Sequence, residues 1–226
     1  MNGWLVRHVD LADLQRIAEA LHATLPEHAV IGLRGSLGAG KTRFAQCFAV
    51  AIGIDATDVT SPTFGIVHHH HGARRLHHID AYRLADEDEF IELGGEELLE
   101  EESAVVLIEW PERIVGCLPP GCWMIDLEIE SSGEASGQAR MSVAADPAEG
   151  DFGGLELGSM PSGGTRQVRF SVPDAAMSQA LRESVARLLG RSPENDRDGA
   201  VAERADGDLT GVERADGDGV VREENG

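Results

Sequence analysis

The stretch that decides the fold of this chain is Gly35-Ser36-Leu37-Gly38-Ala39-Gly40-Lys41-Thr42. It matches the pattern G-x-x-x-x-G-K-[ST], in which backbone N–H groups cradle the phosphates of a nucleotide. Lys41 is the only lysine among 226 residues, and the other eighteen strong bases are arginines. Because an ammonium is a compact point charge and a guanidinium is a wide planar fork, only the lysine suits a site between two phosphates. All eight residues and the following Arg43 are therefore predicted to contact a nucleotide.

The segments on both sides of this loop have the character that such a loop requires. Residues 29–34 form an apolar run that predicts a buried strand, and apolar residues recur at helical spacing from Gly40 until Gly53. An earlier helix is predicted to begin after Asp10, a residue type that caps helix N-termini, and to end near Leu25. A phosphate-binding loop joins a strand to a helix, so this context supports the motif.

The rest of the chain completes an α/β pattern. Residues 104–108 are apolar and rich in β-branched side chains, which predicts a central strand buried on both faces. Further strands are expected at 64–71, 75–79, 123–130 and 166–172, with 139–145 as a hairpin partner of 123–130, and further helices at 86–102 and 173–189. We expect a three-layer α/β sandwich of the P-loop NTPase type with a mixed, mainly parallel central sheet.

The composition of the C-terminal third sets the predicted domain boundaries. Residues 146–165 hold six glycines and two prolines, which favours a mobile insertion. After residue 190 the apolar periodicity ends, and a ten-residue repeat begins at Glu203 and again at Glu213. The chain is therefore predicted to contain one P-loop ATPase domain over residues 1–190 and a disordered acidic tail over 191–226.

The net charge of −21 argues against a protein that grips nucleic acid unaided, so DNA binding is not expected. Residues 86–102 carry ten carboxylates and no base. A solvated helical face is the interpretation that we favour, and a docking surface for a basic partner is the alternative. Three cysteines without C-x-x-C spacing indicate reduced thiols, and neither a signal peptide nor a membrane span is found, which favours a cytoplasmic protein.

Phosphoryl transfer also needs a metal, an acid to hold it and a group that orients the attacking water. Thr42 supplies a hydroxyl for Mg²⁺. Asp80 and Glu109 each end an extended stretch, so both are expected at the carboxyl edge of the sheet, where open α/β sheets bind ligands. With Lys41 they are the candidate catalytic residues, and with Thr42 the candidate metal ligands. The alternative for either acid is that it caps the helix that follows.

Three further features have two interpretations each. Thr63 lies where a mobile loop would reach a γ-phosphate, or it forms a plain turn after Pro62. Trp110 is a candidate nucleotide contact, or an aromatic anchor in the core. The tract His68–His71 invites a metal site, but alternate side chains of a strand point to opposite faces, so at most two of these imidazoles share one side. We therefore favour a hairpin rim without a native metal.

Four blocks in this order and spacing resemble the TsaE (YjeE) family of bacterial P-loop ATPases: 37–42, Ser61-Pro62-Thr63-Phe64, 78–84 and 108–113. The resemblance covers about residues 10–130. It implies a factor for the threonylcarbamoyladenosine modification beside the tRNA anticodon, acting with TsaB-like and TsaD-like partners that carry the tRNA. It also implies that Lys41 and Thr42 bind phosphate and Mg²⁺, that Thr63 belongs to a switch-like loop and Asp80 to the metal environment, and that Glu109 serves hydrolysis beside Trp110. The chain departs from the family pattern at Ser36, where an acid is usual, and at Arg43, where a second Thr is usual.

Other P-loop activities stay open at this stage. A small-molecule or nucleoside kinase would need a lid with arginines, for which Arg74 and Arg75 are candidates, although no segment has the length of a lid. A regulator that binds ATP without hydrolysing it is the second alternative. A GTPase is disfavoured, since the Asn-Lys-x-Asp motif for guanine needs a second lysine.

Overall fold

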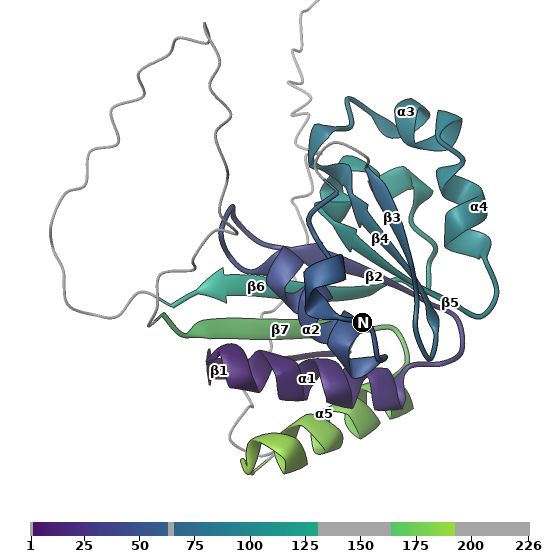
Figure 1. Ribbon diagram of the computed structural model, residues 1–226. Helices are drawn as coiled ribbons and strands as arrows, with labels where there is room; N and C mark the ends of the chain where they lie inside the picture. The colour runs from purple at the N-terminus through teal and green to yellow at the C-terminus, as the bar shows by residue number, and fades with distance from the viewer. Residues whose placement is uncertain (1, 63–65, 131–163, 193–226) are drawn as a thin grey trace, which may run out of the picture.

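The computed structural model describes residues 2–62, 66–130 and 164–192, which form one mixed seven-stranded sheet between two layers of helices (Figure 1). The strands are β1 (Asn2–Val9), β2 (Ala29–Arg34), β3 (Val67–His71), β4 (Arg75–Asp80), β5 (Ala104–Glu109), β6 (Trp123–Ile129) and β7 (Arg166–Val172). The helices are α1 (Leu11–Thr24), α2 (Lys41–Ala51), α3 (Glu87–Glu92), α4 (Gly95–Glu100) and α5 (Ala175–Leu189). Short 3₁₀ helices are η1 (Ala56–Asp58), η2 (Ala81–Arg83), η3 (Pro111–Arg113) and η4 (Val115–Cys117).

The sheet has the strand order β1-β7-β6-β2-β5-β4-β3. Its four central strands, β6, β2, β5 and β4, run parallel, and antiparallel pairs close both sides: β3 beside β4, and β7 between β6 and β1. Parallel strands place their carboxyl ends at one edge. The ends of β2, β4 and β5 therefore meet where the predicted phosphate loop begins.

Strand β5 shows why the sheet needs a layer on each face. All six of its residues are buried, and alternate side chains enter different hydrophobic clusters. Val105 and Leu107 join the cluster under α1, α2 and α5, while Val106 and Ile108 join the cluster under α3, α4 and the 3₁₀ segments. A continuous apolar run rich in β-branched residues is thus stable here because both faces exclude water.

The helices begin at side chains that accept their unpaired N–H groups. Asp10 accepts from the N–H of Asp13 at 2.8 Å and begins α1, as the sequence predicted. Asp174 accepts from Met177 at 2.8 Å and begins α5, so this helix starts two residues later than the predicted Pro173. Asp86 caps α3 in the same way, which gives one member of the acid-rich segment a structural role.

The predicted fold class is confirmed: the sheet is mixed, its centre is parallel, and helices cover both faces. Strand β1 was not predicted, because its sequence has neither a regular alternation nor a long apolar run: only Trp4–Val6 form a short buried stretch between exposed residues. The antiparallel neighbour of β6 is β7, and the predicted partner 139–145 lies outside the described residues. The same holds for residues 146–163 of the predicted insertion 146–165 and for residues 193–226 of the predicted tail 191–226. Among the helices that the structure describes, none is long and apolar enough to cross a membrane.

Candidate nucleotide-binding site

The predicted phosphate loop follows β2 and leads directly into α2 (Figure 1). Its strand is held on one side by β5 and on the other by β6, both in parallel register. The ends of β4 and β5 lie in register beside it, with Asp80 opposite Glu109. Residues that are far apart in the sequence are thus brought to one edge of the sheet.

Glycines let the loop follow a path that other residues would obstruct. Gly35 has φ +147°, and a Cβ at this position would lie 2.3 Å from the carbonyl oxygen of Leu127 in β6. Gly40 has φ +107° and stands immediately before α2. Both backbone conformations are ones that L side chains rarely adopt. The loop can therefore turn tightly against β6 and present the N-terminus of α2, which is a favourable place for anions.

The Lys41 side chain lies within its own loop. Its Nζ donates to the carbonyl oxygens of Gly35 at 2.9 Å and Ser36 at 3.1 Å, and it lies 3.7 Å from the centre of the Trp110 ring. Burial lowers the pKa of Lys41 from its ordinary value, while the carboxylates of Glu109, Glu112 and Asp80 oppose this shift. The one lysine of the chain is thus a buried cation at the carboxyl edge of the sheet.

Glu109 joins the loop helix to the sheet. Its Oε2 accepts a hydrogen bond from the hydroxyl of Thr42 at 3.0 Å, and its Oε1 lies 2.9 Å from Nε2 of His78 on β4. Both Glu109 and His78 are almost fully buried. Among the described residues, none forms a hydrogen bond with the other ring nitrogen of His78. The N-cap position of η3 is held by Trp110, without a side-chain capping bond, and the two oxygens of Glu109 are directed at Thr42 and His78 instead.

Asp80 has a different set of partners. Its Oδ1 accepts from the N–H of Tyr82 at 3.1 Å and so caps η2, which is the structural alternative that the sequence left open. Its Oδ2 accepts from the hydroxyl of Ser61 at 2.7 Å. Ser61 lies in the segment that leads to Thr63. Asp80 therefore links this segment to the carboxyl edge of the sheet.

Trp110 lies beside the lysine with its backbone in the left-handed region, at φ 60°. Its ring centre is 5.1 Å from that of Tyr82, and the two planes meet at 47°. The ring is partly buried against the cluster under α3 and α4. Trp110 is thus an aromatic anchor whose ring lies beside Lys41, and its contact with a nucleotide stays a prediction.

The structure brings together most of the residues predicted for this site, with three exceptions. Thr63 lies outside the described residues. The guanidinium of Arg43 donates to Gln46 on the next turn of α2, at 3.0 Å, and so is directed along the helix. Leu37 is 82% exposed at the tip of the loop. Each of these residues stays a predicted nucleotide contact.

Sequence reasoning missed His78, Ser61 and Tyr82 as parts of the site. A signal for His78 was available, because residues two apart on a strand share a face, and His78 precedes Asp80 by two positions. The bond from Ser61 joins residues nineteen positions apart, which no local pattern indicates.

The histidine tract forms a separate polar group on the β3–β4 hairpin. Nδ1 of His69 lies 2.8 Å from Nδ1 of His77, and Nε2 of His77 lies 2.6 Å from Oε2 of Glu101. Burial and the neighbouring bases lower the pKa of His77 to about 4. Among the described residues, no group of three or more His, Cys, Asp or Glu side chains could hold a metal ion.

The residues at the loop fit a magnesium-bound nucleotide. Gly35 lets the loop lie close against the Leu127 carbonyl of β6, Lys41 provides the ammonium, and Thr42 provides a hydroxyl next to a carboxylate. Mg²⁺ is usually held by one or two protein oxygens together with substrate phosphates and water, so a cage of three carboxylates is not required. The arrangement can bind a polyphosphate and hold a cation beside it.

Comparisons with known proteins agree with this geometry. A family model described as "Threonylcarbamoyl adenosine biosynthesis protein TsaE" matches residues 9–140. Three relatives are each named tRNA threonylcarbamoyladenosine biosynthesis protein TsaE. The protein of Treponema pallidum is 36% identical over 54% of this chain and 88% of its own length, that of Aquifex aeolicus 37% over 57% and 88%, and that of Bacillus subtilis 39% over 50% and 70%.

A solved structure shares the fold. It is described as the crystal structure of Bacillus subtilis YdiB, and it superposes with a TM-score of 0.51 over 82% of this chain and 95% of its own. The sequence identity over this superposition is 24%, so the likeness concerns the fold alone.

Proposed function

The chain belongs to the TsaE family of threonylcarbamoyl adenosine biosynthesis proteins, and we propose that it serves this pathway as a magnesium-dependent ATPase. The observation that carries the proposal is the hydrogen bond from Thr42 to the buried carboxylate of Glu109, directly after the only lysine of the chain. A hydroxyl and a carboxylate joined in this way belong to the machinery that holds a metal beside nucleotide phosphates. The adenine nucleotide is favoured over guanine because the second lysine of a guanine motif is missing.

Each residue of the site has a proposed task. The N–H groups of the loop and the Lys41 ammonium bind the β- and γ-phosphates, and Thr42 offers its hydroxyl oxygen to Mg²⁺. When bound, the metal ion neutralises negative charge on the phosphates. Glu109 fixes the orientation of the Thr42 hydroxyl and accepts a proton from the attacking water, or orients that water. His78 holds the other oxygen of Glu109, so that the carboxylate cannot rotate away.

Asp80 and Trp110 complete the proposed site. Asp80 belongs to the metal environment through water and ties the segment before Thr63 to the sheet by its bond with Ser61. Through that bond, a contact between Thr63 and the γ-phosphate would change the position of Asp80 at the carboxyl edge of the sheet. Trp110 limits the space around Lys41 and shields it from solvent on one side.

The surface charge supports work with partner proteins. With a net charge of −21, the chain is unsuited to hold tRNA by itself, so we propose that TsaB-like and TsaD-like proteins carry the tRNA. We also propose that the chain is cytoplasmic. The exposed acids of α3 and α4 suit contact with a basic surface, although Asp86, Glu87 and Glu101 already serve bonds within the fold. The modified nucleoside is the adenosine next to the anticodon, as the family resemblance implies.

The test is ATP hydrolysis by the full chain, alone and with purified TsaB and TsaD from the same source. We expect slow release of phosphate by the chain alone, faster release with the pair, and threonylcarbamoyladenosine in added tRNA over several turnovers. Phosphate transfer to a nucleoside, together with no binding to the pair, would favour the kinase instead. Tight ATP binding without hydrolysis under either condition would favour the non-hydrolysing regulator.

A further inference from the structure

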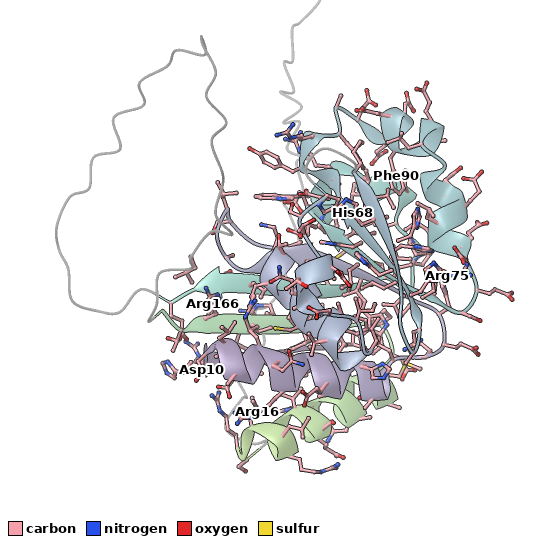
Figure 2. All side chains as sticks on the ribbon, in the orientation of Figure 1. Asp10, Arg16, His68, Arg75, Phe90 and Arg166 are labelled. Atoms are coloured by element: carbon pink, nitrogen blue, oxygen red, sulfur yellow. The ribbon has the colours of Figure 1, made fainter. Side chains whose placement is uncertain are left out.

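We propose that Arg166 is a positioning residue of the nucleotide site, whose guanidinium holds the back of the phosphate loop so that a loop N–H points at the phosphates. This inference rests on the proposed function. Arg166 is the first residue of β7 and lies outside the segment 9–140 that the family model matches. Figure 2 labels it at the end of the sheet where β6 and β7 lie side by side.

The contact is a buried, charge-assisted hydrogen bond. Nε of Arg166 donates to the carbonyl oxygen of Ala39 at 2.8 Å, and a terminal nitrogen donates to the carbonyl oxygen of Gly164 at 3.1 Å. Arg166 is 5% exposed and Ala39 is fully buried. Bonds from an ionised donor are about twice as strong as those between neutral groups. A planar guanidinium with two of its nitrogens engaged is also fixed in orientation.

The bond controls the direction of the next N–H group. The carbonyl of Ala39 and the N–H of Gly40 belong to one trans peptide plane, and in such a plane the two groups point in opposite directions. Holding the Ala39 oxygen toward β7 therefore turns the Gly40 N–H toward the opposite side, where the loop faces its ligand. Gly40 has φ +107° and no Cβ, so its own residue type does not restrict this rotation.

A second contact shows that the sheet supports the loop from behind. Gly35 approaches the carbonyl of Leu127 in β6 so closely that a Cβ would lie 2.3 Å from it. In the register of β6 and β7, Leu127 lies opposite Val168 and Ile129 opposite Arg166. The loop thus rests on two paired strands, at Gly35 through van der Waals contact and at Ala39 through Arg166. A rigid support of this kind holds a binding site more accurately than a free loop.

Arg166 could instead serve only to hold the beginning of β7 in place. The experiment must therefore separate this structural role from the positioning of the phosphate loop. The variants are Arg166→Gln, Arg166→Lys and, as a matched control, Arg169→Gln. Arg169 lies three residues along the same strand, hence on the other face, opposite Asp126 and Leu5 in the register. For each full-length variant, calorimetry gives the dissociation constant for MgADP, and a thermal scan gives the melting temperature.

We expect Arg166→Gln to bind MgADP about tenfold more weakly or worse, since a charge-assisted bond that orients the loop is lost. Arg166→Lys keeps the charge and one bond, so it should lie between Arg166→Gln and the parent. Arg169→Gln should bind as the parent does. Unchanged affinity in Arg166→Gln would overturn the proposal, whatever happens to its melting temperature.

Two further measurements keep the result clear. If Arg166→Gln does not fold, Arg166→Lys decides: parental affinity together with unchanged hydrogen exchange of residues 35–42 would overturn the proposal. Faster exchange of this segment in the nucleotide-free variant would support it, because it reports the loop without requiring activity. If the parent chain itself fails to bind MgADP, the proposed function fails, and that outcome is distinct from the failure of Arg166 alone.

Discussion

Replacing Gly35 by alanine tests whether the phosphate loop depends on its close approach to β6. The added Cβ would lie 2.3 Å from the carbonyl oxygen of Leu127 and 3.1 Å from Cβ of Ala39. Ordinary contact begins at 3.4 Å, so the loop must move back by about 1 Å. The backbone oxygen of a paired strand cannot swing aside as a flexible side chain would. Misplacing a site by this much can lower its performance by about 10²-fold.

The same substitution also has a stability term. A non-glycine residue at φ +147° is strained, which costs of the order of 1–3 kcal/mol. For an ordered region of this size, each kcal/mol lowers the melting temperature by about 2–4 °C. Gly53→Ala is the matched control, since Gly53 has φ +83° but a Cβ there would have no atom of the described residues within 4 Å. It carries backbone strain without the overlap and lies beyond the loop, at the end of α2.

The assay is calorimetric titration with MgATP, run beside thermal melts of both variants and the parent. We expect Gly35→Ala to lose about 10- to 10²-fold in affinity, because losing one hydrogen bond to a charged phosphate costs about 1.5–3 kcal/mol. Gly53→Ala should lose some stability and bind as the parent does. Two results would refute the idea that β6 fixes the position of the loop. One is a dissociation constant of Gly35→Ala within threefold of the parent value, and the other is a melting temperature no lower than that of Gly53→Ala.

Three further predictions concern side chains of the site and the core. Lys41→Ala and Lys41→Arg should both lose MgATP binding in the same titration, because no second ammonium is available and a guanidinium does not fit; binding by either variant would contradict this. Glu109→Gln should keep the parental affinity and lose about 10²–10⁴-fold in hydrolysis; normal phosphate release would remove Glu109 from the mechanism. Cys47 and Cys122 should resist a thiol reagent at pH 8 until the protein unfolds, while Cys117 reacts first. Burial raises the pKa of Cys47 and that of Cys122, the latter to about 11, so little reactive thiolate forms at these two buried residues. Rapid labelling of Cys122 in the native protein, mapped by mass spectrometry, would contradict its buried position.

Much of the site could be predicted because its parts are local in the sequence. The loop pattern, the strand before it and the helix after it are contiguous, and Glu109 is the last residue of the most apolar strand. Thr42 and Glu109 were both expected near the metal, and they are joined by a hydrogen bond. Whether an acid at a strand end caps the next helix was not decidable from the sequence, and the two acids differ: Asp80 caps η2, while the Glu109 carboxylate is directed at Thr42.

The parts that could not be predicted depend on contacts between distant segments. Strand β1 has little pattern of its own and is stabilised by pairing with β7, which begins more than 150 residues later. The bond from Arg166 to Ala39 spans 127 positions. Nothing near Arg166 distinguishes it from Arg169, and only the register of the sheet brings one of them to the loop.

By itself, therefore, the sequence determined the type of protein: a glycine-rich loop, one lysine and two strand-end acids identify a P-loop protein through residue types at short spacing, where backbone geometry is predictable. The tertiary structure alone decided which groups contact the loop and the two acids. Strand order and register are set by packing over the whole chain, so the partners of Glu109, Asp80 and Ala39 emerge only when the sheet is assembled.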